Sequence, residues 1–165
     1  MSHVTESTFR LEYVAWDDPR ALELRRVMVV EMDIRYSVPG RAGNSDEINR
    51  ALAVDINDVR ATLLAIDADG TPIGHAALRE LNGELEVRRV VVSDAQRGRG
   101  VGRALMGELE RFARDARAAR LILQTGEKQP ESVAMYENLG YTRIAVYQPY
   151  IASMPHSLCF EKVLA

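Results

Sequence analysis

The chain has little cysteine and histidine. Cys159 is the only cysteine among 165 residues, and there are three histidines. A single thiol cannot form an intramolecular disulfide, and it excludes a structural zinc site built from several thiolates. A chain of this length buries roughly 70% of its unfolded surface. We therefore expect a core held by packing alone, with no metal ion.

Long apolar runs and a surplus of one charge are also missing. The longest apolar runs, such as residues 27–30, span four positions, whereas a membrane-crossing helix needs about 20. Residues 1–11 are polar and lack the apolar stretch of a signal peptide. Twenty-one Lys and Arg against 24 Asp and Glu give a net charge of −3, which excludes a strongly basic nucleic-acid-binding protein. We expect one cytoplasmic domain over residues 1–165, with no nucleic-acid or membrane partner.

Apolar spacing and turn residues predict an α+β fold. Helical spacing and capping residues predict helices over 21–32, from 45 onward, over 101–117 and over 130–139. In the first of these, Leu22, Leu24, Val27, Met28 and Val30 form a broad apolar stripe. Strands are predicted over 9–16, 59–67, 71–81, 85–92, 121–125, 141–147 and 157–163. Tight turns at 67–70 and 82–83 make the second to fourth strands an antiparallel meander. The sum is a single mixed sheet of about seven strands, flanked by about four helices.

The segment between the strand at 85–92 and the helix at 101–117 is rich in glycine and arginine. Backbone N–H groups at a helix N-terminus have no partner within the helix and attract anions. Gly98, Gly100 and Gly102 would let a ligand approach the backbone, and Arg97, Arg99 and Arg103 add positive charge. The spacing fits neither the dinucleotide fingerprint nor the P-loop. It favours a diphosphate site; the alternative is an arginine-rich turn that only caps a helix.

Two motifs in this half of the chain resemble one family. Residues 96–102, with the sequence QRGRGVG, resemble the Arg/Gln-x-x-Gly-x-Gly/Ala signature of the GNAT superfamily of N-acetyltransferases. Residues 86–92 resemble the strand that precedes this signature. Residues 131–141 resemble its second segment, a helix that ends in Leu-Tyr-x-x-x-Gly-Phe/Tyr. The resemblance covers residues 84–141, about half of the chain, and it implies the GNAT acyl-CoA N-acyltransferase fold.

The resemblance implies acetyl-CoA as the acetyl donor. Backbone N–H groups of residues 98–103 would hold its pyrophosphate. The strand would pair with its pantetheine arm, because the strand ending at Val92 and the strand at 121–125 separate there in this family. Gln129 stands where many members have an Asn that contacts the cofactor. The cofactor-binding residues so implied are Val90, Val91, Val92, Arg97, Gly98, Arg99, Gly100, Val101, Gly102, Arg103, Gln129 and Tyr136.

Amine acetylation needs loss of a proton from the amine, a donor to the oxyanion and a proton for the departing thiolate. Tyr136 matches the family tyrosine that serves as general acid; the alternative is an aromatic ring packed on the sheet. The Val92 N–H or a neighbouring one would serve the oxyanion. Period-2 alternation places Glu86 on the face of Val90 and Val92, where it would act as base, directly or through water. Alternatively, Glu86 pairs with Arg88 or another cation at the sheet surface.

The sequence leaves the acceptor open. The C-terminal segment, residues 147–162, resembles bacterial members that act on small molecules, which favours a small-molecule primary amine and direct transfer in a ternary complex. Tyr36, Arg41, Tyr147 and Tyr150 lie in or near two loops that could line an acceptor pocket. Two alternatives remain: a protein or peptide N-acetyltransferase, and a non-catalytic acyl-CoA-binding sensor module. Dimers are frequent in the family, so the resemblance is also compatible with a homodimer.

Overall fold

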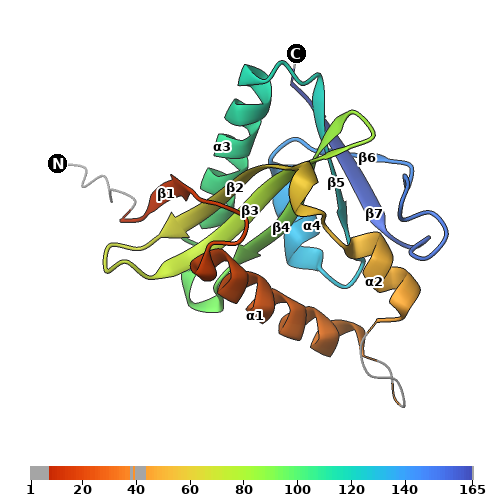
Figure 1. Ribbon diagram of the computed structural model, residues 1–165, viewed down its shortest axis with the longest axis horizontal. Coiled ribbons are helices and arrows are strands. Elements are labelled where there is room, and N and C mark those ends of the chain that lie inside the picture. Colours follow the sequence, from red (N-terminus) through yellow and green to blue (C-terminus); the bar gives the residue numbers. More distant parts are fainter. Residues whose placement is uncertain (1–7, 38, 40–43, 165) are drawn as a thin grey trace.

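The computed structural model describes residues 8–37, 39 and 44–164, which form one seven-stranded sheet with helices on both faces (Figure 1). In chain order the elements are β1 (Arg10–Tyr13), α1 (Pro19–Tyr36), α2 (Asp46–Leu52), β2 (Val59–Ile66), β3 (Pro72–Leu81), β4 (Glu84–Val92), α3 (Val101–Asp115), β5 (Arg120–Thr125), α4 (Pro130–Asn138), β6 (Thr142–Ile144) and β7 (Leu158–Val163). Short 3-10 turns precede β2 and follow β4.

The strand order is β1-β2-β3-β4-β5-β7-β6. The β1 to β4 pairs are antiparallel, β4 and β5 are parallel, and β7 lies antiparallel between β5 and β6. The parallel pair needs a crossover, which α3 provides. The predicted α+β class, the meander and the mixed sheet of seven strands with four α-helices are therefore confirmed over the described residues.

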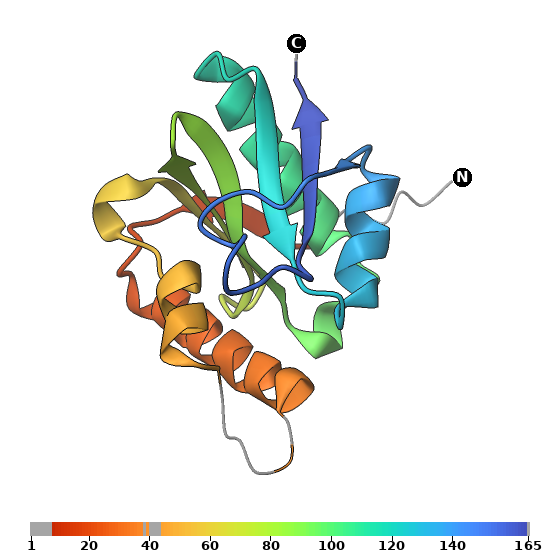
Figure 2. The same ribbon diagram turned by 90° about the vertical axis from the view of Figure 1, so that its right-hand side faces the viewer.

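The helices form two layers. Helices α1 and α2 lie on one face of the sheet, and α3 and α4 lie on the other (Figures 1 and 2). The larger apolar core lies on the α3 and α4 side, where Leu105, Met106 and Leu109 of α3 are fully buried against the sheet. A smaller cluster packs Ala21 and Leu24 of α1 against β2.

Polar caps fix where the first two helices begin. The Asp18 carboxylate accepts a hydrogen bond from the Arg20 N–H, with Pro19 in the first turn. The Ser45 hydroxyl accepts from the Ile48 N–H at 3.2 Å, and two acidic residues follow it in the first turn of α2. These contacts satisfy donors that the helix leaves unpaired. The predicted starts, residue 21 and residue 45, agree with the observed ones to within two residues.

The apolar stripe predicted on α1 is wrong in part. Leu24 is buried, but Leu22, Val27 and Val30 are about half exposed, and the buried positions include Ala21 and Arg25 instead. The apolar residues of α1 are spread around the helix among its charged residues, so their spacing carries little information about which face packs. The helix also continues to Tyr36, four residues beyond the predicted end.

Two further absences hold within the described ranges. No helix there combines enough length and apolar character to cross a membrane. No group of three or more His, Cys, Asp or Glu side chains is arranged there to hold a metal ion.

Candidate active site

A β-bulge in β4 shapes the site. Ala77 pairs with Arg88 and His75 with Val91, so two residues of β4, Arg89 and Val90, oppose only one residue of β3. Arg89 takes a left-handed φ of 54° to make this possible. The extra residue reverses the alternation of side chains along β4. The predicted shared face is therefore wrong: Val90 and Val92 pack with the α3 side of the sheet, and Glu86 lies on the opposite face.

Strands β4 and β5 separate where the bulge begins. Their pairing runs from Leu85 with Leu121 to Val87 with Leu123 and stops there. The Ser93 N–H donates to the carbonyl of Ile73 in β3, and Val91 pairs with His75, also in β3. Backbone groups alternate between the two edges of a strand, so those of Val90 and Val92 point toward the gap beside β5. A strand-like ligand could pair with them there.

The glycines after β4 serve two different purposes. Gly98 and Gly100 have φ values of 88° and 78°, and Gly100 is the residue that precedes α3. No neighbour would touch a Cβ at either position, so backbone conformation selects glycine there. A Cβ on Gly102 would lie 2.7 Å from the Met135 sulfur. Gly102 thus permits close packing of α3 on α4, and it also lines the loop cavity described next, where its role toward a ligand stays a prediction.

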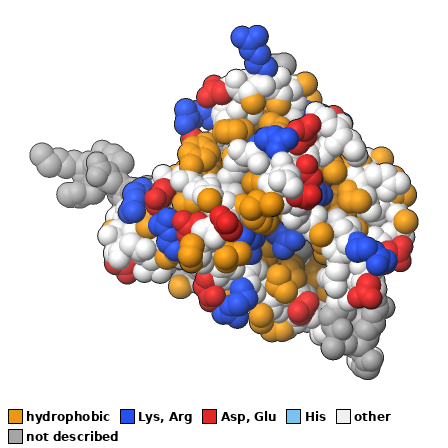
Figure 3. Space-filling model, viewed as in Figure 1, with side chains coloured by type: hydrophobic (Ala, Val, Ile, Leu, Met, Phe, Trp, Pro, Cys, Tyr) orange, Lys and Arg blue, Asp and Glu red, His pale blue; other side chains and the backbone are white. Residues whose placement is uncertain are grey.

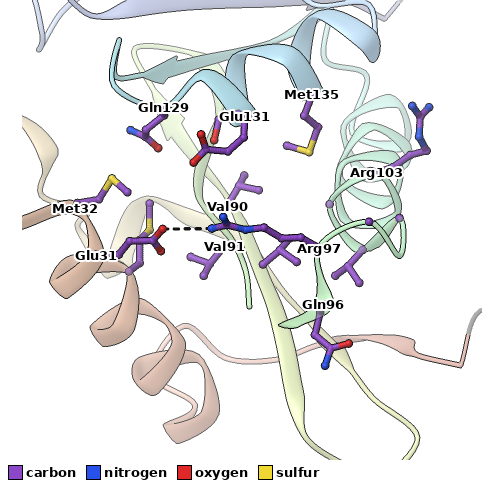
Figure 4. Close-up of a pocket in the computed structure, with 17 residues that line it drawn as sticks. Glu31, Met32, Val90, Val91, Gln96, Arg97, Arg103, Gln129, Glu131 and Met135 are labelled. Atoms are coloured by element: carbon purple, nitrogen blue, oxygen red, sulfur yellow. Dashed lines mark hydrogen bonds and ion pairs between the residues drawn. The ribbon is translucent and has the colours of Figure 1, made fainter. Parts of the chain in front are cut away.

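A cavity of about 330 Å³, the loop cavity, opens between α1, α4 and the glycine-rich segment (Figure 4). Most of the predicted cofactor-binding residues line it. Its lining comprises Met28, Glu31, Met32, Val90, Val91, Val92, Gln96, Arg97, Gly98, Gly100, Val101, Gly102, Arg103, Gln129, Glu131, Ser132 and Met135. The start of α3 points unpaired N–H groups into this region, which suits a diphosphate.

The three arginines of the glycine-rich segment lie differently. Arg97 extends across the loop cavity to Glu31 of α1 at 3.3 Å, and it also pairs with Asp94 at 2.8 Å (Figure 4). The Arg103 side chain lines the rim and points outward (Figure 4). Arg99 is outside the lining: its guanidinium reaches Asp67 at 3.3 Å and Thr8 at 2.6 Å. The side chain of Arg99 therefore fixes the β2–β3 turn, and only its backbone stays near the cavity.

A second cavity of about 280 Å³, the bulge cavity, adjoins the first. Its lining comprises Met28, Val29, Met32, Asp33, Tyr36, Asn44, Asn49, Leu52, Val87, Arg88, Arg89, Val90, Gln124, Thr125, Gly126, Gln129, Ser132, Tyr136 and Met154. Five residues line both cavities: Met28, Met32, Val90, Gln129 and Ser132. The two spaces therefore meet at the gap between β4 and β5.

Gln129 lines both cavities and therefore lies at their junction, and Tyr136 lines the bulge cavity only. The Tyr136 ring packs edge-on against Tyr141 and at a tilt against Phe160, and only 6% of the residue is exposed. Burial raises the pKa of its phenol above the usual value, so it stays protonated. The Gln129 amide lies 3.5 Å from the Tyr36 hydroxyl, at the start of α4.

Glu86 lies in a buried polar cluster behind the strand. It is fully buried; Arg79 Nε donates to its carboxylate at 2.8 Å, and Arg88 Nη1 lies 3.5 Å away. The Tyr147 and Tyr150 hydroxyls also donate to it. Glu86 lines neither cavity. The arrangement matches the ion-pair alternative, although it is buried and not at the sheet surface.

The other candidates separate clearly. Tyr36 lines the bulge cavity, whereas Tyr147 and Tyr150 hold Glu86, and Arg41 lies outside the described residues. Cys159 is fully buried in β7, where burial raises the pKa of its thiol.

Several lining residues escaped the sequence analysis. Met28 was predicted only as part of the apolar stripe of the first helix. Met32, Glu31, Arg89 and Ser132 had no predicted role in a site. Gly126 directly follows β5, and a Cβ there would lie 1.7 Å from the Tyr36 hydroxyl oxygen. A glycine at the end of the strand beside the gap is the one signal that could have indicated this close approach.

Comparison with known proteins decides the family. Residues 27–141 match the family model described as the acetyltransferase (GNAT) family. The chain belongs to the GNAT acetyltransferase family. It is thus an N-acetyltransferase by family, and the resemblance carried by residues 84–141 is confirmed.

Two curated relatives give context for this GNAT chain. It is 34% identical to an IAA acetyltransferase of Azospirillum brasilense over 132 residues, which cover 80% of this chain and 69% of the relative. It is 30% identical to a streptothricin acetyltransferase of Streptomyces lavendulae over 122 residues, which cover 70% and 64%. The chain thus spans about two thirds of the length of these relatives.

Solved structures share the fold. A candidate acyl-CoA N-acyltransferase of Klebsiella pneumoniae superposes with a TM-score of 0.78 at 22% identity, covering 97% of this chain and all of the other. The PaiA N-acetyltransferase of Thermoplasma acidophilum, solved in complex with coenzyme A, gives a TM-score of 0.67 at 15% identity, covering 94% and 98%. At these identities the likeness establishes the GNAT fold alone.

Proposed function

We propose that this GNAT protein transfers the acetyl group of acetyl-CoA to the primary amine of a small molecule, within a ternary complex. One observation carries the proposal. The loop cavity and the bulge cavity meet where the backbone of Val90 and Val92 faces the gap beside β5, and Tyr136 stands in the wall of the second cavity. Donor and acceptor would meet at this junction.

The donor fits the loop cavity. The unpaired N–H groups at the start of α3 would hold the pyrophosphate, with Arg97 released from Glu31 to join them. The pantetheine amides would pair with the backbone of Val90 and Val92, and Gln129 would contact the arm from α4. This arrangement places the thioester at the junction, where the N–H of Val92 or its neighbour donates to the developing oxyanion.

The acceptor amine would enter through the bulge cavity. Its proton passes to water, since Glu86 lines neither cavity and is held by Arg79 and Arg88. The neutral nitrogen attacks the thioester carbon and loses a second proton to water as the C–S bond breaks, and the Tyr136 hydroxyl donates its proton to the departing sulfur. Solvent then restores the Tyr136 proton. We propose Glu86 as a positioning residue that orders β4 from the opposite face.

The small-molecule acceptor is supported by the size of the bulge cavity, about 280 Å³, and by the two curated relatives, whose names specify IAA and streptothricin. The test measures thiol release from acetyl-CoA against a panel of amines, with N-terminal peptides as a second panel. Amine-dependent release with small molecules supports the proposal. Release with peptides alone, or coenzyme binding without release for any amine, contradicts it.

A further inference from the structure

The charged groups of the bulge cavity are unevenly paired. Three charged side chains line it: Asp33 from α1, and Arg88 and Arg89 from β4. Asp33 is exposed at the α1 wall. The remaining lining is apolar or neutral and polar. The cavity therefore carries more positive than negative charge, which is unexpected for a site that only admits an ammonium group.

Arg88 already has its partners. It is buried, its Nη1 donates to the Tyr150 hydroxyl and lies near Glu86, and its Nη2 donates to the Leu52 carbonyl at 2.7 Å. Its donors are thus occupied within the protein, so Arg88 is not available to a ligand, although it shares the single Glu86 carboxylate with Arg79.

Arg89 differs from its neighbour. Among the described residues, its Nη2 donates to the same Leu52 carbonyl at 2.9 Å, and no carboxylate pairs with it. Its Nε is buried without a hydrogen-bond partner. Arg88 already caps the end of α2 through the Leu52 carbonyl, so capping alone does not require a second guanidinium there. A half-buried cation without an anion carries a cost in free energy that a ligand could relieve.

The surroundings of Arg89 add to this cost. Burial and the nearby guanidinium groups of Arg88, Arg25 and Arg79 lower its pKa to about 10. The side chain nevertheless stays charged at neutral pH. Arg89 is also the bulge residue with positive φ, so the strand distortion that opens the junction also aims this side chain into the cavity. Figure 3 shows Lys or Arg side chains at the edge of a hollow between α1 and α2.

We propose that the acceptor carries an oxyanion, a carboxylate or a phosphate, which binds the Arg89 guanidinium while its amine lies at the junction of the two cavities. This inference rests on the proposed function and specifies its substrate class: a compact amine that also bears an anionic group. A planar guanidinium can hold either oxyanion through paired hydrogen bonds. An acceptor with several ammonium groups and no anion is disfavoured.

The first experiment compares matched amines. β-Alanine, β-alaninamide and aminoethylphosphonate share one chain length and differ in the group opposite the amine, and 1,3-diaminopropane replaces the anion by a cation at a similar length. We expect kcat/KM to be roughly 10- to 100-fold higher for an anionic member than for the amide, as for a hydrogen bond to a charged group. The amine of β-alaninamide is less basic than that of β-alanine, so more of it is neutral at a given pH. Ease of deprotonation would therefore favour the amide and cannot explain a preference for the acid. The acid and the phosphonate distinguish the two anions.

Variants connect the preference to Arg89. Arg89→Met should abolish the preference, so that the ratio of kcat/KM for the anionic member to kcat/KM for the amide falls to about one. Arg60→Met is the matched control, because Arg60 is exposed on β2 and pairs with Glu80 far from either cavity. Arg89→Lys keeps the charge and should retain part of the preference. It is the variant to use if Arg89→Met fails to fold.

A binding experiment separates the two proposals. Calorimetry in the presence of coenzyme A compares N-acetyl-β-alanine with its amide, and needs no turnover. If the acid binds in an Arg89-dependent way but no amine is acetylated, the proposed anion site stands and the proposed acetyl transfer is overturned. Acetylation of acid and amide at equal kcat/KM, or an unchanged ratio in Arg89→Met, would overturn the anionic acceptor and leave the acetyl transfer standing.

Discussion

Tyr136 combines a buried ring with a place in the wall of the bulge cavity. Its neighbour Tyr141 is also buried, and its hydroxyl has no hydrogen-bond partner in the part of the chain that the structure describes, yet Tyr141 lines neither cavity. Burial raises the pKa of both phenols, and they differ because Tyr136 lines the bulge cavity whereas Tyr141 does not. This difference makes Tyr141 a control for a catalytic role of Tyr136.

Replacing Tyr136 by phenylalanine should lower kcat by about 100-fold, as expected for loss of a general acid. Binding of acetyl-CoA should weaken by less than threefold, because the ring and its packing are kept. Steady-state kinetics with calorimetry of the coenzyme gives both numbers. Tyr141→Phe should change neither. Unchanged turnover in Tyr136→Phe would remove this residue from the mechanism.

His75 supports the bulge from β3. It is fully buried; its Nδ1 lies 2.7 Å from the Arg89 carbonyl oxygen and its Nε2 lies 3.0 Å from Arg25 Nη1. These contacts require a neutral ring that donates through Nδ1 and accepts through Nε2. Burial is the main reason why the pKa of His75 falls from 6.5 to about 4.

The shift predicts a pH-dependent stability. Between pH 6.5 and about 4 the unfolded chain binds this proton more readily than the folded one, so the free energy of unfolding falls as the pH falls. From pH 7 to pH 5 the contribution lost should be about 2 kcal/mol. Urea unfolding should show this difference between the native protein and His75→Asn, whose amide can still donate to the Arg89 carbonyl. His156 is exposed, so His156→Asn should retain the native pH profile.

At the scale of elements, the sequence predicted the strands and helices better than the faces they present. The meander was predictable because Asp-Gly and Asn-Gly turns separate alternating strands. The bulge could not be predicted from the sequence. Arginine does not indicate a positive φ, and the distortion at Arg89 arises from how β4 pairs with β3. One extra residue was enough to reverse the expected side of Glu86. Nor could the sequence indicate that Arg99 turns toward Asp67, since that contact joins residues far apart in the chain.

The start of α3 illustrates what glycine positions predict and what they do not. The sequence correctly indicated a tight, positive-φ segment between β4 and α3, with Gly98 and Gly100 in that conformation. It could not separate these from Gly102, whose role depends on Met135 of α4 lying against it. The distinction matters for mutagenesis, because backbone conformation opposes a side chain at Gly98 or Gly100, whereas contact with Met135 opposes one at Gly102.

Substitutions at Gly100 should separate backbone conformation from size. Gly100→Val should weaken coenzyme A binding by at least 10-fold in a folded protein, because a β-branched residue resists φ of 78°. Gly100→Asn should bind with nearly native affinity, since asparagine tolerates left-handed φ and no neighbour lies within 4 Å of a Cβ there. Calorimetry with coenzyme A and circular dichroism measure both effects. Equal losses in the two variants would contradict this reasoning and favour direct contact of the side chain with the ligand.

At the scale of the whole molecule, the loop cavity and the bulge cavity adjoin each other, and the single thiol lies apart from both. The cavities share five lining residues at the gap between β4 and β5. Cys159 lies in β7, pairs with Gln124 of β5, is fully buried and lines neither cavity. Burial also raises the pKa of its thiol, which lowers the thiolate fraction that could accept an acetyl group.

The architecture therefore predicts direct transfer. With both substrates varied, initial-velocity plots should intersect, as for a ternary complex, and should not run parallel as in ping-pong kinetics. Cys159→Ala should keep kcat within about twofold, since Cys159 lines neither cavity, although loss of a buried sulfur should cost about 1 kcal/mol of stability. Mass spectrometry after incubation with acetyl-CoA alone should find no acetylated enzyme. Parallel plots together with an acetyl group on any residue would show that a covalent intermediate forms, and the junction of the two cavities would then be a route between two half-reactions.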